Sequence, residues 1–364
     1  MSASTTFRNN ATVDKTEPRL IPGAMLGGES LAIEKGATLD DVKLQAVWAD
    51  SQHFTVHSDL MAHQVSGETA FELESFWLNL DSQSLPLGLE IAFGKMNTKA
   101  TQSATWHASQ FVFSEAPLLS DVFWGRHFSD TGMRLSRSVK GVSVGVEAWN
   151  GDSWPASVGE GSADAYIHLA QAWGFVSLRS GAWVMGSKAE NRMDTRYGAG
   201  HSHGGLTISN PVSDFAFTGD ILTRGAFIDL TFPLKGLELN GNFELIAQSY
   251  DGEVQNTNQN SAFEANYQGI RFEMSATSER HTVSASYESL NFENHFYGSV
   301  TQLFVSGAGL LNNGFEPEKT SLAWNFQWKP ELTFRTEWVA DKSVSEEAVN
   351  RLNFGFRWSH EWCL

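Results

Sequence analysis

The sequence predicts an all-β protein, a transmembrane antiparallel β-barrel of about sixteen strands. The C-terminal segment alternates large apolar side chains with polar ones, and the same alternation recurs upstream between turn signals. No stretch approaches the ~20 consecutive apolar residues of a transmembrane helix. Because successive side chains of a strand point to opposite faces, each such strand can turn one face to lipid and the other to water.

The C-terminal segment carries the clearest alternation. Its even positions are Leu352, Phe354, Phe356, Trp358, His360, Trp362 and Leu364. Its odd positions are Asn353, Gly355, Arg357, Ser359, Glu361 and Cys363. A soluble sandwich also alternates, but it seldom places four large aromatic residues on one face of its last strand. The even face is therefore predicted to contact lipid.

Upstream segments repeat this pattern. Residues 318–328 and 331–341 form a predicted hairpin with an aromatic outer face, joined at Lys329-Pro330. Residues 237–250 and 266–289 alternate in the same way and gather their charges on one face. The predicted strands are 22–33, 42–49, 53–61, 71–80, 87–95, 131–137, 141–149, 163–170, 174–187, 224–232, 237–250, 266–277, 280–289, 318–328, 331–341 and 350–363.

The lengths of the connections predict the orientation of the barrel. Short turns follow the even-numbered strands and longer loops follow the odd-numbered ones, which is the asymmetry of short periplasmic turns and long extracellular loops. An odd strand count would break this parity, so about fourteen strands is the alternative. Residues 1–21 are predicted to be a periplasmic N-terminal extension, and residues 22–364 the barrel domain.

Composition narrows the environment and the partners. A net charge of −17 disfavours nucleic acid and favours cations as small partners. The start of the chain lacks the apolar core of a signal peptide, so a mature sequence located in the bacterial outer membrane is expected. The single cysteine, Cys363, cannot form an internal disulfide.

Four segments resemble a known group of bacterial proteins. They are FELESFWLNLDSQSLPLGLEIAFGKMN, FVFSEAPLLSDVFWGRHFSDTGMRLS, SVGVEAWNGDSWPAS and FAFTGDILTRGAFIDLTFPLKGLELNGNFELIAQSYDG. Their order resembles porin-like Gram-negative outer-membrane barrels labelled zinc-regulated or TonB-dependent-receptor-like, and more distantly phosphate-selective porins. The resemblance implies a barrel without a plug domain. That group often has His-Pro-His in a loop where this chain has Trp106-His107-Ala108, which argues against a metal role there.

The predicted lumen face is rich in charge. Its carboxylates are Glu72, Glu74, Glu90, Glu147, Asp229, Glu238, Glu244, Glu273, Glu288 and Glu337, and its bases are Arg134, Arg179, Arg271, Arg335 and Arg357. Among these, Glu90, Glu238, Glu244, Glu273, Arg271, Glu288, Arg335, Glu337 and Arg357 are the candidate pore-lining residues. Carboxylates around a water-filled pore favour cations. The alternative is that these charges cross-link neighbouring strands and crowd the lumen.

The long segment between residues 96 and 130 is the candidate constriction loop. If it folds inward, its side chains line or plug the opening. The candidates are Trp106, His107, Phe111, Phe113, Trp124 and Arg126. The alternative is an extracellular loop that packs on its own aromatic residues.

His201 and His203, in YGAGHSHGG, are a weak candidate metal pair. Two imidazoles can share a transition-metal ion, but a structural zinc site needs four ligands, and a solvated glycine-rich loop is the alternative. The sequence has no GxSxG, HExxH or GxxxxGK[ST] motif, so no enzyme activity and no cofactor are predicted.

These observations predict an outer-membrane porin-like channel through which small hydrophilic solutes diffuse passively, with cations favoured. Its partners are then outer-membrane lipid and the solutes or cations. Porins of this strand number are often trimers, but the sequence has no signature of a homo-oligomer. The alternative is a closed-lumen surface receptor or assembly scaffold whose long extracellular loops bind a metal or protein partner. A barrel hydrolase is the third hypothesis.

Overall fold

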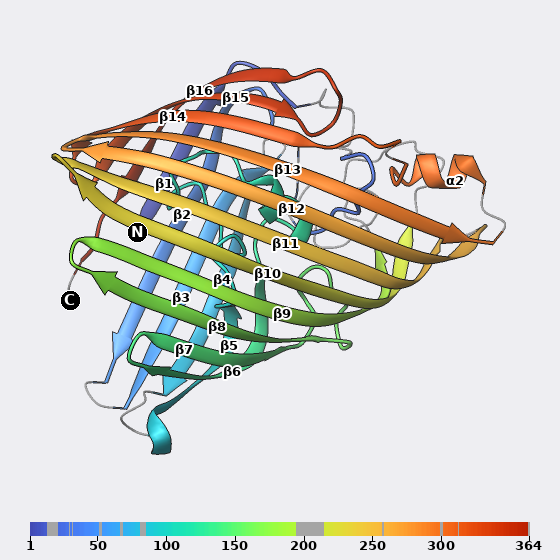
Figure 1. Cartoon of the computed structure of the whole chain (residues 1–364), viewed down its shortest axis with the longest axis horizontal. Helices are drawn as coiled ribbons and strands as arrows, with labels where there is room; N and C mark the ends of the chain where they lie inside the picture. The colour runs from blue at the N-terminus through green and yellow to red at the C-terminus, as the bar shows by residue number, and fades with distance from the viewer. Residues whose placement is uncertain are drawn as a thin grey trace.

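Sixteen antiparallel strands close into one barrel in the computed structural model, which describes residues 1–12, 21–28, 30, 32–50, 53–65, 68–80, 85–193, 215–256, 258–298, 301–311 and 313–362. Every strand pairs with its neighbours in sequence, and β1 pairs with β16 to close the ring (Figure 1). The strands are β1 (Ser2–Arg8), β2 (Gly36–Ala49), β3 (Phe54–Val65), β4 (Glu68–Leu80), β5 (Leu89–Asn97), β6 (Ser129–Val139), β7 (Val142–Trp149), β8 (Ser162–Trp173), β9 (Val176–Met193), β10 (Ala216–Leu234), β11 (Leu237–Gln255), β12 (Asn260–Ser278), β13 (His281–Tyr297), β14 (Glu318–Lys329), β15 (Leu332–Lys342) and β16 (Val349–Ser359). The helices are η1 (Pro86–Gly88), α1 (Leu118–Phe123) and α2 (Gln302–Gly307).

The predicted fold class and strand number are confirmed, with one correction at the N-terminus. Residues 22–33 form no strand among those described, and Ser2–Arg8 forms β1 instead. The predicted 1–21 extension is therefore wrong for residues 2–8, which lie in the barrel wall. This strand has little apolar contrast, since its inward residues are Ser2, Ser4, Thr6 and Arg8. Its pairing with β2 and β16 places it in the wall.

The two faces of the wall follow the predicted alternation. On β16, Leu352, Phe354 and Phe356 are 43–49% exposed, whereas Arg351 and Asn353 are at most 1% exposed. A continuous sheet exposes apolar side chains in this way when its outer face contacts lipid rather than water. The described residues include no helix long and apolar enough to cross a membrane.

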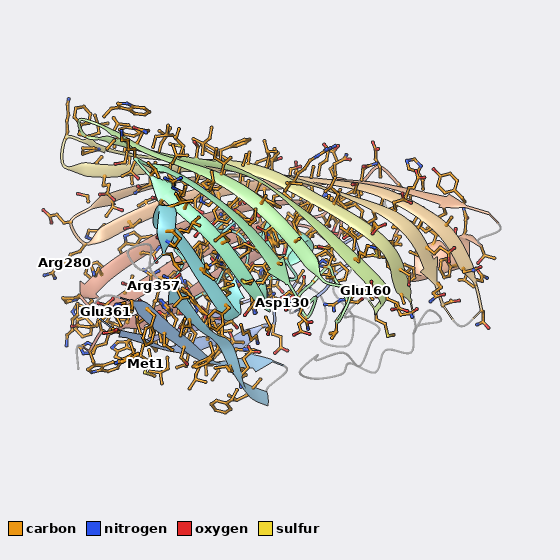
Figure 2. All side chains as sticks on the ribbon, turned by 90° about the horizontal axis from the view of Figure 1, so that it is seen from below. Met1, Asp130, Glu160, Arg280, Arg357 and Glu361 are labelled. Carbon is orange, nitrogen blue, oxygen red and sulfur yellow. The ribbon has the colours of Figure 1, made fainter. Side chains whose placement is uncertain are left out.

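Two-residue turns are common at one end of the barrel, and most connections at the other end are longer, although only two residues separate β3 from β4 there and four separate β11 from β12. Residues 140–141, 174–175, 235–236, 279–280 and 330–331 join successive strands at the same end as Met1 and the C-terminal residues (Figures 1 and 2). In two of these turns a Lys-Gly pair has positive φ, 50° and 82° at Lys140 and Gly141, and 48° and 85° at Lys235 and Gly236. Two successive left-handed residues match the twist of a hairpin, which explains glycine at the second position.

Strands β10 to β13 form a tall wall. They contain 17–19 residues, whereas a transmembrane strand needs roughly 9–11. On β12 the outward side chains change from Met274, Phe272 and Ile270 to Gln268 and Asn266 toward the long-loop end. The outer face therefore becomes polar above an apolar band, and these strands, which extend past the other strands in Figure 1, are long enough to project beyond the lipid.

Candidate functional site

The loop of residues 98–128, between β5 and β6, lies inside the ring of strands (Figure 1). Every residue of its helix α1 is buried, and α1 packs against β11, β12 and β13. Gly125 and Arg126 have positive φ values of 59° and 87°, which turn the chain after α1. Of the two courses that the sequence left open for this loop, inward or extracellular, the inward one is observed. The loop defines the candidate site because it crosses the lumen.

Three strand carboxylates hold the loop by accepting hydrogen bonds from it. Glu244 of β11 accepts from the Ser103 hydroxyl at 2.8 Å and from the Thr101 hydroxyl. Glu288 of β13 accepts from the backbone N–H of Leu118 at 2.6 Å. Glu337 of β15 accepts from both the N–H and the hydroxyl of Ser114.

Cationic side chains hold the loop through its backbone carbonyls. The Arg335 guanidinium donates to Ala108 O at 3.1 Å, and Arg357 donates to Phe111 O at 2.8 Å. Lys319 donates to Ala116 O. Removing a charged group from water is costly unless polar partners replace the water. In each contact, the dipole of a loop carbonyl takes the place of water around the cation.

Four predicted pore-lining residues therefore do not border open water. Glu244, Glu288, Glu337 and Arg335 are 2–3% exposed. The prediction that these four residues line an open passage is wrong, because the loop occupies the space that they face. The other predicted pore-lining carboxylates and one arginine are partly or fully exposed; they are Glu90, Glu238, Glu273 and Arg357. Arg271 is buried and forms an ion pair with Glu273.

A buried ion triad fixes the middle of the loop. Arg351 of β16 donates to Glu115 Oε1 and Oε2 at 2.9 and 2.8 Å and to Asp341 Oδ2 at 2.8 Å, and all three side chains are at most 3% exposed. Burial opposes ionisation of Glu115, but the Arg351 guanidinium outweighs it and holds the pKa of this carboxyl far below its usual range. Sequence analysis missed Arg351 and Glu115, although Arg351 has the inward parity of the terminal strand.

Two loop histidines face one strand carboxylate. His107 Nε2 lies 3.6 Å from Glu74 Oε1, and His127 Nε2 lies 3.4 Å from Glu74 Oε2. The two imidazole centroids are 5.3 Å apart. No group of three or more His, Cys, Asp or Glu side chains with a metal-binding arrangement occurs in the described part of the chain. His201 and His203 lie outside the described residues.

The other candidate constriction residues pack within the loop or against the wall. Trp106 packs with Phe111, with ring centroids 6.4 Å apart, and Phe113 is buried. Trp124 is fully buried, donates to the Ser103 hydroxyl at 3.2 Å and lies 5.1 Å from the ring of Trp183. Arg126 pairs with Asp121 at 3.1 Å, which stabilises the turn after α1.

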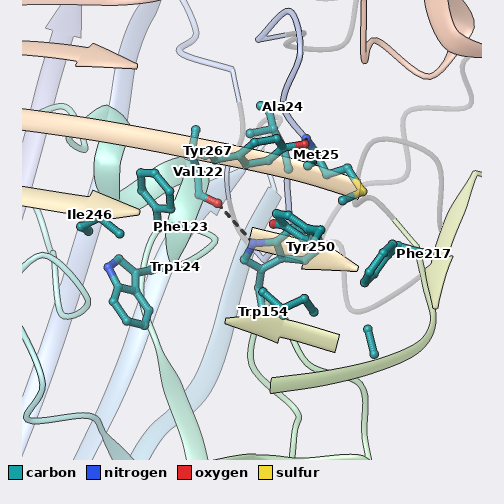
Figure 3. Packing of buried hydrophobic residues seen from close by; sticks show 14 of the residues in the cluster. Ala24, Met25, Val122, Phe123, Trp124, Trp154, Phe217, Ile246, Tyr250 and Tyr267 are labelled. Atoms are coloured by element: carbon teal, nitrogen blue, oxygen red, sulfur yellow. Dashed lines mark hydrogen bonds between the residues drawn. The ribbon is translucent and has the colours of Figure 1, made fainter. Parts of the chain in front are cut away.

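An apolar cluster fills the lumen beside the tall wall. It joins α1, residues 21–26, Trp154 and α2 to inward aromatic residues such as Tyr250 and Tyr267 (Figure 3). The Trp154 indole donates to Val122 O at 3.2 Å. A Cβ atom on Gly28 would lie 2.3 Å from Gly125 O, so glycine is required where these two loops meet.

Charge is distributed unequally between the two ends. At the long-loop end, exposed carboxylates outnumber exposed ammonium groups among the described residues. The carboxylates are Asp152, Glu160, Glu190, Asp220, Asp251, Glu253, Glu264, Glu293, Glu316, Glu346 and Glu347, and the ammonium groups are Lys35, Lys188 and Lys342. The turn end exposes both bases, such as Lys140, Lys235 and Arg280, and carboxylates, such as Glu279 and Glu361 (Figure 2).

Comparison with solved structures identifies the fold. The chain is similar over 99% of its length to 99% of the anion-selective porin from Comamonas acidovorans, with a TM-score of 0.57 and 9% identity. It matches the outer membrane channel DcaP of Acinetobacter baumannii over 99% of this chain and 95% of that one, with a TM-score of 0.55 and 11% identity. The chain has the porin fold of bacterial outer-membrane barrels. An outer membrane protein of Vibrio cholerae, OmpT in trimer form, shares this porin fold over 98% and 96% of the chains, with a TM-score of 0.51 and 10% identity.

No family model and no curated protein matches the chain. At 9–11% identity, the structural likeness establishes the porin fold alone.

Proposed function

We propose that this protein is an outer-membrane porin-like barrel through which small hydrophilic solutes diffuse, with the loop of residues 98–128 as the constriction. The observation that carries the proposal is the seating of this loop across the lumen by Glu244, Glu288, Glu337 and Arg335. A loop that is held by strands on several sides of the lumen narrows the passage through the barrel. The proposal assigns no catalytic step and no cofactor.

Preference for cations is part of the proposal. The carboxylate-rich long-loop end and the net charge of −17 support it, because surface charge concentrates counter-ions at a channel entrance. In planar bilayers with a KCl gradient, the reversal potential is expected to favour K⁺ and to move toward zero at high salt as the charges are screened. A reversal potential that favours chloride would refute this preference.

The seating of the loop is tested by a disulfide. The hydroxyls of Ser2 on β1 and Ser109 in the loop are 3.0 Å apart. In a Cys363→Ala background, Ser2→Cys with Ser109→Cys is therefore expected to form a disulfide on oxidation, detected by mass spectrometry of non-reduced peptides. The single-channel conductance is expected to stay unchanged on oxidation, because the loop is already seated.

The matched control pairs Ser2→Cys with Ser284→Cys. Ser284 is also buried, but it lies on β13, away from the contact between β1 and the loop. Equal cross-linking in both variants, or none in the first, would contradict the seated loop. A fall in conductance on oxidation would show that the loop leaves its seat in the unlinked protein.

A closed-lumen receptor or scaffold is the second candidate function, favoured by the apolar cluster beside the tall wall. Single-channel recording separates the two, since a closed barrel inserts into bilayers without opening steps. Homo-oligomerisation, which one similar structure displays, belongs to the proposal as an expectation. Native mass spectrometry in detergent measures it.

A further inference from the structure

A cavity of about 620 Å³ lies beneath the seated loop at the turn end of the barrel. It is lined by residues of β2 to β6, by loop residues such as Thr105 and Gln110, and by Met1, Glu361 and Trp362. The lining residues used below are Lys43, His57, Asp59, Ser75, Trp77, Asn97, Lys99 and Arg134. Met1 and Glu361 mark this end of the molecule in Figure 2. The volume is typical of small-molecule sites.

One cation of the cavity lining, that of the exposed residue Lys99, has no ion-pair partner in the described part of the chain, while the carboxylates of Asp59 and Glu361 line the same cavity. Lys43 is matched by Asp59 at 3.3 Å, and Arg134 by Glu147 in an ion pair. The Lys99 ammonium has neither an ion pair nor a hydrogen bond among the described residues. Burial and the neighbouring Arg134 lower the pKa of Lys99, while Glu90 and Glu147 oppose this shift. An anion placed there would relieve the repulsion between the two cations.

Two buried polar atoms in the lining lack a hydrogen-bond partner within the described protein. They are the Ser75 hydroxyl and the side-chain oxygen of Asn97. Buried polar groups are nearly always hydrogen-bonded, so such atoms in a cavity wall indicate a polar ligand or bound water. The Asn97 amide can also turn its NH₂ group inward and donate. Together with Lys99, which lines the same cavity, these groups form a set that suits an oxyanion.

One flank of the cavity is aromatic. The His57 imidazole stacks on Trp77 with ring centroids 3.9 Å apart and an interplanar angle of 3°. A planar, partly apolar body can rest against this flank while its charged end reaches Lys99. The lining therefore combines one cation without an ion-pair partner among the described residues, two neutral hydrogen-bonding groups and a flat surface.

We propose that this cavity is a binding site for small organic carboxylates, whose carboxylate is held by Lys99 with Ser75 and Asn97. The site goes beyond passive diffusion, because it gives the turn end a preference for an anionic group that the acidic long-loop end lacks. It does not depend on an open passage, since solute reaches it from the turn end. A closed barrel would keep the site.

The proposal is tested by calorimetric titration of the full chain in detergent with succinate, using the uncharged succinamide as the matched ligand. Succinate is expected to bind, and succinamide to bind at least about tenfold more weakly. Lys99→Met is expected to weaken succinate binding about tenfold or more, Lys99→Arg to retain most of it, and Ser75→Ala to weaken it less than Lys99→Met. Lys188→Met, which removes an exposed lysine at the opposite end, is expected to leave it unchanged.

Succinate binding is also expected to disappear as the pH rises through the lowered pKa of Lys99, because only the ammonium form attracts the carboxylate. Equal binding by Lys99→Met and the parent chain, or no heat of binding, would overturn the proposal and leave bound water as the partner of Ser75 and Asn97. Bilayer conductance tests the proposed channel separately, since loss of succinate binding with conductance intact refutes only the site.

Discussion

Phe272→Arg is expected to destabilise the barrel by about 2–4 kcal/mol, because it places a charge on the lipid face near the middle of the apolar band. Phe272 lies on β12, points outward and is 46% exposed. Its neighbours across the strands on the same face are Phe243 and Tyr287. The measurement is the free energy of unfolding by guanidinium chloride in lipid vesicles.

The matched control is Asn266→Arg on the same face of the same strand. Asn266 lies six residues toward the long-loop end, roughly 20 Å at the rise of a strand. There the outer face is polar, so the expected cost is about 0–1 kcal/mol. Equal costs at the two positions would contradict the assigned height of the membrane, and a negligible cost at Phe272 would contradict a lipid-facing wall.

Arg351→Met is expected to destabilise the folded barrel by about 3–5 kcal/mol, because it leaves Glu115 and Asp341 as buried carboxylates without their cation. Since Glu115 belongs to the loop, the loop is also expected to be released, which urea titration of the unfolding transition and proteolysis of residues 98–128 would both detect. A triple variant, Arg351→Met with Glu115→Leu and Asp341→Leu, is expected to recover much of the loss, because no buried charge then lacks a partner.

Lys342→Met provides the comparison with an exposed pair. Lys342 lies next to Asp341 in sequence and faces Glu318 at 3.8 Å, with both side chains more than a third exposed. Solvent screens this pair, so the expected loss is below about 1 kcal/mol. If the two single variants lost the same stability, the buried triad would not be the anchor of the loop.

The triad also sets the response to acid. The pKa of Glu115 is far below its ordinary value, because Arg351 outweighs the effect of burial. A carboxyl with a depressed pKa contributes its full stability above its unfolded pKa and loses it as the pH falls toward the folded value. The contribution of Glu115 is therefore expected to begin to fall within the usual titration range of glutamate, where the unfolded chain takes up its proton, and to be lost progressively as the pH falls toward the depressed folded value. Proteolysis of the loop as a function of pH measures this.

Local sequence determined most of the barrel. The alternation of Leu352, Phe354 and Phe356 with Arg351 and Asn353 predicts both faces of β16, because a two-residue period depends only on the chain itself. Turns such as Lys140-Gly141 mark the hairpins for the same reason. β1 escaped prediction because Ser2, Ser4 and Thr6 carry little apolar contrast, and its place in the wall depends on pairing with β2 and β16.

Tertiary structure decided what the lumen contains. The sequence indicates that Glu244, Glu288 and Glu337 face inward. The two-residue period of a strand does not determine whether an inward carboxylate contacts water or a loop. The answer depends on contacts such as Ser114 with Glu337, which are 223 residues apart in the chain. Ser75 lies on β4 and Lys99 lies just after the neighbouring strand β5, but the cavity that they line is completed by Met1, Glu361 and Trp362 from the two ends of the chain. The sequence by itself determined a barrel with a charged interior. The folded structure decided that this interior holds a seated loop above a cavity, because the seat of the loop and the cavity both depend on contacts between distant segments.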